Sequence, residues 1–155
     1  MRRAEMTKDV EMRDCSKMTV GIVVADFHAD ITHSLLDGAL ELLKEWKVKD
    51  KNIIVRHVYG AFDLPFAAQK MLKQNKKMGA VIALGCVLTG ETKHNEYISH
   101  AVAGGLMRVQ LDTRVPIALG VLTPNTLEQA KARSAKGKEN TGRTSAIAAL
   151  SMAMN

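Results

Sequence analysis

A histidine at the end of a glycine- and threonine-bearing turn is the feature of this sequence that most directly indicates chemistry. His94 ends the segment Gly85-Cys86-Val87-Leu88-Thr89-Gly90-Glu91-Thr92-Lys93-His94, between the apolar run 80–84 and a helical pattern over 95–111. A strand that opens into such a turn brings free backbone N–H groups and the positive end of a helix dipole together, which favours an anion. Histidine has the unperturbed pKa closest to neutral pH, so His94 is a candidate proton carrier beside an anion site, with a surface residue near a helix end as the alternative.

The same turn offers ligands for a phosphate group. Thr92 and the backbone near Gly90 supply hydroxyl and N–H donors. The sequence contains neither GxGxxG nor GxxxxGK[ST], and it has no nucleophile elbow or Ser/His/Asp order. These donors are candidates for binding a phosphate, and nucleotide binding by those two routes has no support in the sequence.

Hydrophobic periodicity predicts the elements that position this turn. Apolar, β-branched runs predict strands over residues 18–25, 52–58, 80–84 and 115–122, the last interrupted by Gly120. Helical spacing predicts helices over 31–47, 64–74, 97–111 and 142–154. Asn125 and Glu128 predict a capping box that begins one further helix. This alternation predicts an α/β fold, a doubly wound parallel sheet with four core strands and helices on both faces, whose strand order the sequence does not reveal.

In such a sheet, ligands collect outside the carboxyl ends of the strands. The segments to search are 26–28, 59–65, 86–94 and 119–123. Phe27 offers a flat face for a heterocycle, with simple packing as the alternative. Asp63, just before Pro65, either begins a helix or accepts hydrogen bonds from a polyol or amine, with Ala61 leaving room. We expect His28 to face solvent.

Length and composition favour a single domain without a membrane segment. The 155 residues are 46% hydrophobic, enough for a core, and no apolar run approaches the roughly 20 residues that span a bilayer. We expect a flexible arm over residues 1–17 and one domain over 18–155; an edge strand lent to a neighbouring subunit is the alternative for the arm. Cys15 and Cys86 lack metal-ligand spacing and favour no disulfide. We expect a cytoplasmic protein with no metal and no membrane association.

The net charge of +6 does not by itself indicate nucleic-acid binding. The chain is only 4% aromatic and has no basic stripe interleaved with stacking residues, so RNA binding is the weakest alternative. Basic residues are densest near the C-terminus, at Lys131, Arg133, Lys136, Lys138 and Arg143. They form either a solvated surface or, for one or two of them, a site for a phosphorylated small molecule.

Taken together, these blocks resemble the 6,7-dimethyl-8-ribityllumazine synthase family from Met18 to the C-terminus. The matching blocks, in the family's order and spacing, are Asp26-Phe27-His28, Gly60-Ala61-Phe62-Asp63-Leu64-Pro65, Ala83-Leu84-Gly85 through Gly90-Glu91-Thr92-Lys93-His94, Gly120-Val121-Leu122-Thr123, and Leu127-Glu128-Gln129-Ala130 with Arg133. The resemblance implies a flavodoxin-like three-layer α/β/α fold. It also implies a cofactor-free condensation of 5-amino-6-(D-ribitylamino)uracil with 3,4-dihydroxy-2-butanone 4-phosphate to 6,7-dimethyl-8-ribityllumazine, the penultimate step of riboflavin biosynthesis.

The resemblance further implies roles for individual residues. Phe27 stacks on the pyrimidine, and the residues that line its pocket and hold the ribityl chain are Ala61, Phe62, Asp63, Cys86, Val87 and Leu88. Glu91, Thr92 and Arg133 bind the phosphate, and His94 is the catalytic proton carrier. Leu119 comes from a neighbouring subunit, so the family implies a homopentamer or a pentamer-based decamer or icosahedral 60-mer.

The chain departs from the family's usual residues at several positions. The family usually has Asn at His28, Pro at Tyr59, Glu at Asp63, Arg at Thr89, Phe at Leu119, Lys at Thr141 and a carboxylate at Thr144. The last two changes concern the loop after Arg133 and bear on phosphate affinity. They leave open an alternative, a catalytically weak or inactive shell-forming or flavin-binding paralogue.

Overall fold

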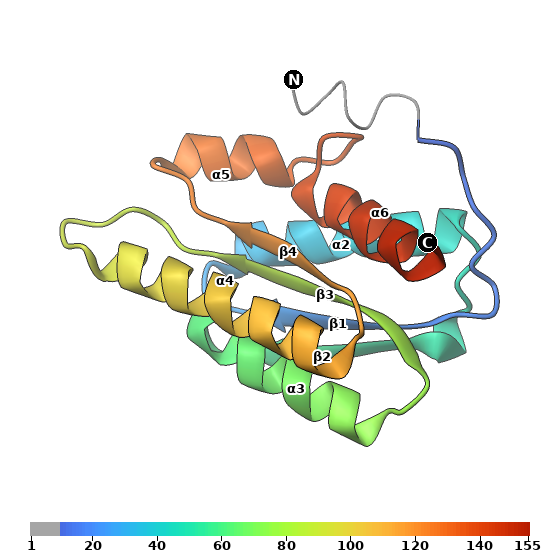
Figure 1. Cartoon of the computed structure of the whole chain (residues 1–155). Helices are drawn as coiled ribbons and strands as arrows, with labels where there is room; N and C mark the ends of the chain where they lie inside the picture. Colours follow the sequence, from blue (N-terminus) through green and yellow to red (C-terminus); the bar gives the residue numbers. More distant parts are fainter. Residues whose placement is uncertain (1–9) are drawn as a thin grey trace.

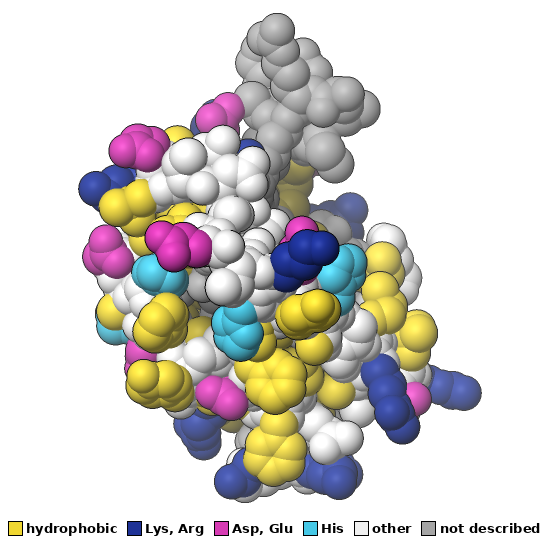
Figure 2. Space-filling view, turned by 90° about the vertical axis from the view of Figure 1, so that its left-hand side faces the viewer, with side chains coloured by type: hydrophobic (Ala, Val, Ile, Leu, Met, Phe, Trp, Pro, Cys, Tyr) yellow, Lys and Arg dark blue, Asp and Glu magenta, His cyan; other side chains and the backbone are white. Residues whose placement is uncertain are grey.

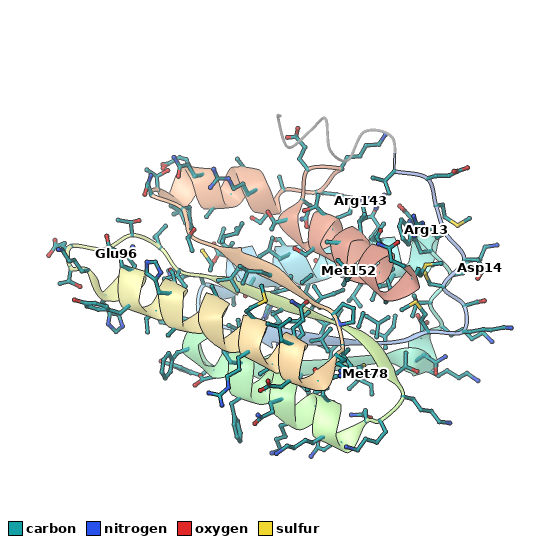
Figure 3. All side chains as sticks on the ribbon, viewed as in Figure 1. Arg13, Asp14, Met78, Glu96, Arg143 and Met152 are labelled. Atoms are coloured by element: carbon teal, nitrogen blue, oxygen red, sulfur yellow. The ribbon has the colours of Figure 1, made fainter. Side chains whose placement is uncertain are left out.

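The computed structural model of the chain describes residues 10–155 and contains a four-stranded, all-parallel sheet. Its strands are β1 (Thr19–Ala25), β2 (Ile53–Val58), β3 (Met78–Cys86) and β4 (Ile117–Leu122), in the order β2-β1-β3-β4. Because the strands are parallel, their carboxyl ends meet at one edge, on the left of Figure 1. Glu96 lies near that edge, whereas Met78, where β3 begins, lies at the opposite end (Figure 3).

Helices cover both faces of this sheet. One layer contains α2 (Ala29–Glu45), α5 (Leu127–Ser134) and α6 (Thr141–Met154), and the other contains α3 (Leu64–Gln74) and α4 (His94–Thr113) (Figure 1). Short 3-10 turns precede β2 (η1, Asp50–Asn52) and α3 (η2, Ala61–Asp63). The predicted three-layer, doubly wound α/β fold is confirmed. Within residues 10–155, no helix has both the length and the apolar character needed to cross a membrane.

The central strand β1 is buried on both sides, which explains its unbroken apolar sequence. Val20, Ile22 and Val24 pack toward α2 and α6, while Val23 and Ala25 pack toward α3 and α4. This alternation is the period of two expected for a strand. The sheet therefore separates two apolar cores, one beneath each helical layer.

Two local predictions were wrong. Gly120 does not interrupt β4, which continues through it; a Cβ there would lie 2.6 Å from the Leu84 side chain and 2.9 Å from the Ala83 carbonyl oxygen. The glycine is therefore a point of close packing within the strand. The N-cap of α5 is Thr126, one residue after the predicted Asn125, and its hydroxyl accepts a hydrogen bond from the Gln129 N–H at 3.2 Å.

The segment before β1 is attached to the fold at Cys15. The Cys15 backbone N–H donates to the Trp46 carbonyl at 2.8 Å, and its buried thiol lies 3.4 Å from the sulfur of Met154. Residues 1–9 of the predicted arm lie outside the described residues. The division into an arm and a domain at residue 18 stays a prediction.

Helices α2 and α6 approach each other closely at two glycines. A Cβ on Gly142 would overlap the backbone of Leu35, and one on Gly38 would overlap the Asn140 side chain. The Asn140 amide donates to the carbonyls of Ser34 and Ser134, at 3.1 Å and 2.8 Å, so it ties α2 to the turn before α6. The close approach at these glycines and the two hydrogen bonds of the Asn140 side chain hold α6 against α2.

We expect Gly142→Ala to lower the free energy of unfolding by about 3 kcal/mol, because the added methyl group meets backbone that cannot rotate away. Gly104→Ala is the matched control, since a Cβ at this exposed helical position meets nothing within 4 Å. That control should raise stability by up to about 1 kcal/mol through helix propensity. Urea unfolding followed by circular dichroism measures both; equal effects of the two substitutions would contradict the packing argument.

Candidate functional site

A cavity of about 350 Å³ opens at the carboxyl edge of the sheet. Of the predicted site residues it is lined by Phe27, Ala61, Phe62, Cys86, Val87, Leu88, Thr92 and His94. It is also lined by His28, Tyr59, Gly60, Gly90, Asn95 and Ile98. Figure 2 faces this edge and shows hydrophobic and histidine side chains gathered together on it. A concave, mainly apolar wall with a few polar groups is typical of a site for a small molecule.

Aromatic rings form one side of this cavity. The Phe27 N–H donates to the Tyr59 carbonyl at 2.9 Å, which ties the end of β1 to the end of β2. The Phe27 ring centroid lies 6.2 Å from that of Tyr59 and 4.8 Å, edge-on, from that of His28. Phe27 keeps 55% of its surface exposed, so a planar ligand can stack on its free face.

His28 does not face solvent as the sequence predicted. It is half-buried on the cavity wall, where it is the N-cap of α2 with φ of 62°. Its carbonyl accepts the N–H groups of Ile31 and Thr32, at 2.9 Å and 3.0 Å, and so begins the helix. Left-handed backbone is uncommon for residues other than glycine and is tolerated better by Asn, Asp and His than by most. The left-handed turn therefore explains why a histidine is tolerated at this position.

The turn predicted to carry chemistry leads into α4, whose first residue is His94. The His94 N–H donates to the Thr92 hydroxyl oxygen at 3.3 Å, and both side chains line the cavity. Thr89 fixes the other end of the turn: its N–H and its hydroxyl donate to the Pro124 carbonyl at 3.2 Å and 3.1 Å. A histidine, a threonine hydroxyl and the N-terminus of a long helix thus meet at one cavity.

Cys86 is a wall residue rather than a nucleophile. Its side chain is buried where β3 ends. Burial, with a smaller contribution from the charge of Asp30, raises the pKa of the Cys86 thiol to about 11. The thiol is therefore protonated near neutral pH, and a protonated thiol is a poor nucleophile.

Four predicted site residues lie outside this cavity: Asp63, Glu91, Leu119 and Arg133. Asp63 caps its own turn, because its carboxylate accepts the Gly60 N–H at 3.0 Å, and it lines a separate hollow between β2 and α3. Glu91 is exposed in the turn before α4, and Arg133 lies on α5. Leu119 on the edge strand β4 is 54% exposed. One chain therefore brings together only part of the predicted site.

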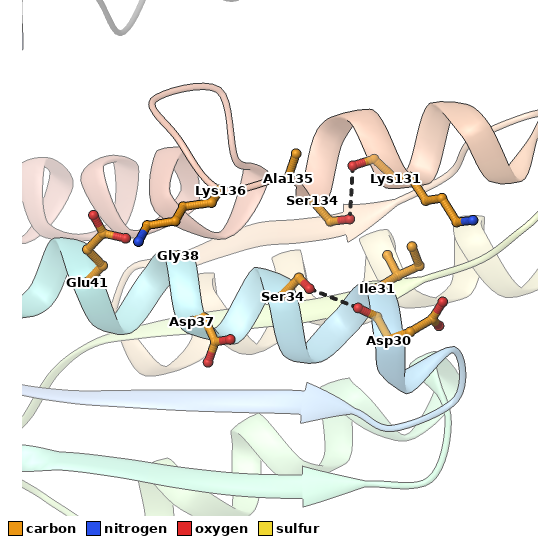
Figure 4. A pocket seen from close by; sticks show the side chains of 10 residues that line it. All are labelled: Asp30, Ile31, Ser34, Asp37, Gly38, Glu41, Lys131, Ser134, Ala135 and Lys136. Atoms are coloured by element: carbon orange, nitrogen blue, oxygen red, sulfur yellow. Dashed lines mark hydrogen bonds between the residues drawn. The ribbon is translucent and has the colours of Figure 1, made fainter.

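A more polar hollow of about 470 Å³ lies between α2 and the end of α5 (Figure 4). Its charged lining residues are Asp30, Asp37, Glu41, Lys131 and Lys136, and of the residues singled out in the sequence it includes only the two lysines of the basic group near the C-terminus. The hydroxyls of Ser34 and Ser134 there bond to carbonyls of their own helices. This hollow lacks the aromatic wall and the histidine of the first cavity.

The basic residues near the C-terminus divide into different surroundings. Lys131 and Lys136 line the polar hollow, while Arg143 forms an ion pair of 2.6 Å with Glu45. Arg143 is only 18% exposed and links α6 to α2. Arg143 therefore fits neither sequence interpretation: it is mostly buried rather than solvated, and its guanidinium pairs with Glu45 rather than being free for a phosphate.

The position of the Cys86 thiol predicts a pH effect on stability. In the unfolded chain the thiol ionises near its ordinary pKa of 9.0, whereas in the folded chain it ionises near 11. The contribution of the protonated thiol to the free energy of unfolding is complete below pH 9.0. It is lost as the pH rises toward about 11, because in that range the unfolded chain binds fewer protons than the folded chain. The difference in unfolding free energy between the wild type and Cys86→Ala should shrink across that window; a constant difference would refute this.

Comparison with known proteins gives one consistent result. A family model described as 6,7-dimethyl-8-ribityllumazine synthase matches residues 17–155. Proteins named 6,7-dimethyl-8-ribityllumazine synthase are similar along most of their length. That of Parabacteroides distasonis is 40% identical over 90% of this chain and 86% of its own. That of Porphyromonas gingivalis is 40% identical over 94% and 90%, and that of Bacteroides fragilis is 39% identical over 87% and 94%.

Proposed function

The chain belongs to the 6,7-dimethyl-8-ribityllumazine synthase family, and from this we propose that the aromatic cavity is where its two substrates meet. The reaction is a transferase step in riboflavin biosynthesis: 5-amino-6-(D-ribitylamino)uracil condenses with 3,4-dihydroxy-2-butanone 4-phosphate. The observation that carries the placement is that Phe27, Thr92 and His94 line one cavity. Holding two substrates together in this way supplies much of the acceleration expected of a condensation.

The aromatic side of the cavity suits the pyrimidine. Its planar ring stacks on the exposed face of Phe27, next to Tyr59. The segments around Ala61 and Cys86 line the far wall, where the buried, protonated thiol presents an uncharged surface. The ribityl chain then runs toward Phe62 at the rim, near the turn that Asp63 caps.

The threonine-bearing turn suits the phosphate. Thr92, the first N–H groups of α4 and the positive end of its dipole favour an anion at this point. Glu91 in the same turn is a further candidate contact, as the family pattern implies. Arg133 would reach the phosphate from a neighbouring subunit, because on its own chain it lies on α5 outside the cavity.

His94 would move the protons that each step needs. The 5-amino group attacks the ketone and water leaves, which forms an imine. A proton is then removed from carbon as phosphate departs, and the ribitylamino nitrogen closes the ring with loss of a second water. His94 stands beside the phosphate ligands and within the same cavity, so it is placed to accept the carbon-bound proton and to protonate a leaving oxygen.

An assembly of identical subunits would complete the site. Large apolar side chains stay exposed on the α3 and α4 layer and on β4: Phe66, Tyr97, Met107, Leu111 and Leu119. Such a concentration of exposed apolar surface marks an interaction site. We place Leu119 of one subunit against the cavity of the next, in the pentamer or pentamer-based shell that the family implies.

Nothing in residues 10–155 favours the alternative of an inactive shell-forming paralogue. The substituted residues have structural partners: Thr89 bonds to the Pro124 carbonyl, and the Thr141 hydroxyl donates to the Arg133 carbonyl at 3.1 Å. The Thr144 hydroxyl donates to the Thr141 carbonyl at 3.2 Å. Thr141 and Thr144 thus have hydrogen-bond partners at the start of α6, where the family usually carries a lysine and a carboxylate.

We expect His94→Ala to slow lumazine formation roughly 10- to 10⁴-fold without dissociating the assembly, because it removes proton transfer and leaves substrate binding in place. The measurement is appearance of the lumazine chromophore from both substrates, with the uncatalysed reaction subtracted. His100→Ala is the matched control, since His100 is an exposed histidine on the same helix and does not line the cavity. An unchanged rate in His94→Ala would remove His94 from the mechanism, and a wild-type rate equal to background would overturn the proposed function.

Leu119→Asp should reduce assembly size and turnover together, because it places a charge where we expect an apolar contact between subunits. Met152→Asp is the control: Met152 is also an exposed apolar residue, but it lies on α6 in the opposite layer (Figure 3). Sedimentation velocity and the lumazine assay report the two properties. If Leu119→Asp kept both the assembly and full turnover, Leu119 would not belong to the shared site.

A further inference from the structure

Three side chains that the proposed function does not use converge just outside the cavity. The Asp26 oxygen Oδ1 lies 2.8 Å from His33 Nε2 and 2.8 Å from His57 Nδ1. The three come from different elements, since Asp26 follows β1, His33 lies in α2 and His57 lies in β2. Of the residues that the structure describes, these alone form a group of three or more potential metal ligands, with the ligand atoms within 4.8 Å of one another.

The backbone holds these three side chains in place. His57 pairs with Val24 in the parallel ladder of β1 and β2, and the Asp26 N–H donates to the Val58 carbonyl at 2.8 Å. His33 lies in the second turn of a long helix. Two of the three side chains therefore stand on a strand and a helix, and Asp26, one residue beyond β1, is held by its backbone hydrogen bond to β2.

The chemistry of the set is that of a transition-metal site. Two imidazoles and one carboxylate are a known ligand set for divalent ions such as Zn²⁺, Co²⁺ and Fe²⁺. Ligand bonds of about 2.0 to 2.2 Å place neighbouring ligand atoms roughly 3 Å apart, close to the 2.8 Å already present between Asp26 and each ring. The two imidazole rings do not stack: their planes are nearly perpendicular, at 82°, and each ring turns one nitrogen toward Asp26 Oδ1.

We propose that Asp26, His33 and His57 form a binding site for one divalent transition-metal ion per chain, held by one carboxylate oxygen and two imidazole nitrogens. Each ring then carries its proton on the nitrogen turned away from the ion. The three side chains keep between 44% and 49% of their surface exposed, so water occupies the remaining coordination positions.

The ion would stabilise the wall of the aromatic cavity. Asp26 immediately precedes Phe27, and His57 lies two residues before Tyr59. An ion bound to both would fix the ends of β1 and β2, which the Phe27–Tyr59 backbone hydrogen bond already joins. The site requires neither lumazine synthesis nor a neighbouring subunit, so it can be tested apart from the proposed function.

The test is a titration of the full-length, tag-free protein with Co²⁺ and with Zn²⁺ at neutral pH. Co²⁺ binding is followed by its visible absorption, Zn²⁺ binding by calorimetry, and stability by the thermal midpoint with and without ion. The variants are His33→Ala, His57→Ala and Asp26→Asn, with His100→Ala as the matched control on α4. Circular dichroism of each variant confirms that it is folded; the two histidines are half-exposed, so their truncation leaves the core intact.

We expect one ion per chain and a thermal midpoint that rises when the ion is added to wild type or to His100→Ala. Losing a ligand should weaken ion binding by roughly 10-fold or more and abolish the rise in midpoint. Even the loss of a residue that only hydrogen-bonds to a metal ligand typically lowers metal affinity about 10- to 100-fold. Two results would overturn the proposal: no binding to wild type, or equal binding to wild type and to both histidine variants. In either case the three residues form only a hydrogen-bonded cluster.

Discussion

The pairing of β1 with β2 on one side and β3 on the other is the constraint on which the rest of the structure depends. The backbone groups of β1 are shut off from water on both faces, so they must bond to the flanking strands. Parallel pairing forces each connection to return across a face as a helix, which creates the two outer layers. It also delivers the segments after β1, β2 and β3 to one edge. The cavity, the His94 turn and the Asp26 cluster therefore lie near one edge of the sheet. Asp26 and Phe27 follow β1, Tyr59 follows β2, and the His94 turn follows β3.

Residue periodicity was enough to predict the elements, because doubly buried strands and amphipathic helices repeat differently. The predicted helix over 64–74 has the same bounds as α3. Strand β3 extends the predicted run 80–84 by two residues at each end, and two of these four are glycines, which carry little strand signal. The positions of Phe27 after a strand and of His94 at the start of a helix were also predictable, because the residue pattern changes at strand ends and helix starts. Eight predicted site residues do line one cavity.

The remaining features depend on contacts between distant parts of the chain. Asp26 and His57 are 31 residues apart, and only the strand order brings them together. Periodicity cannot show that His28 takes a left-handed conformation, so its position on the cavity wall was missed. Leu119 and Arg133 do not line the cavity of their own chain, and residue periodicity alone gives no reason for this; only the family resemblance implied that Leu119 serves a neighbouring subunit. Which side chains meet across the sheet depends on the strand order, and residue composition does not reveal that order.

The close packing of α6 against α2 has a consequence for how the chain folds during synthesis. Residues 141–154 supply Ala146, Ala149 and Leu150 to the core on the α2 face, and Gly142 seats this helix directly on the backbone of Leu35. Until that stretch has left the ribosome, α2 can pack on this face of the sheet, but the apolar side chains that α6 covers stay exposed. This core is therefore completed only when α6 is available to pack against α2, late in the synthesis of the chain.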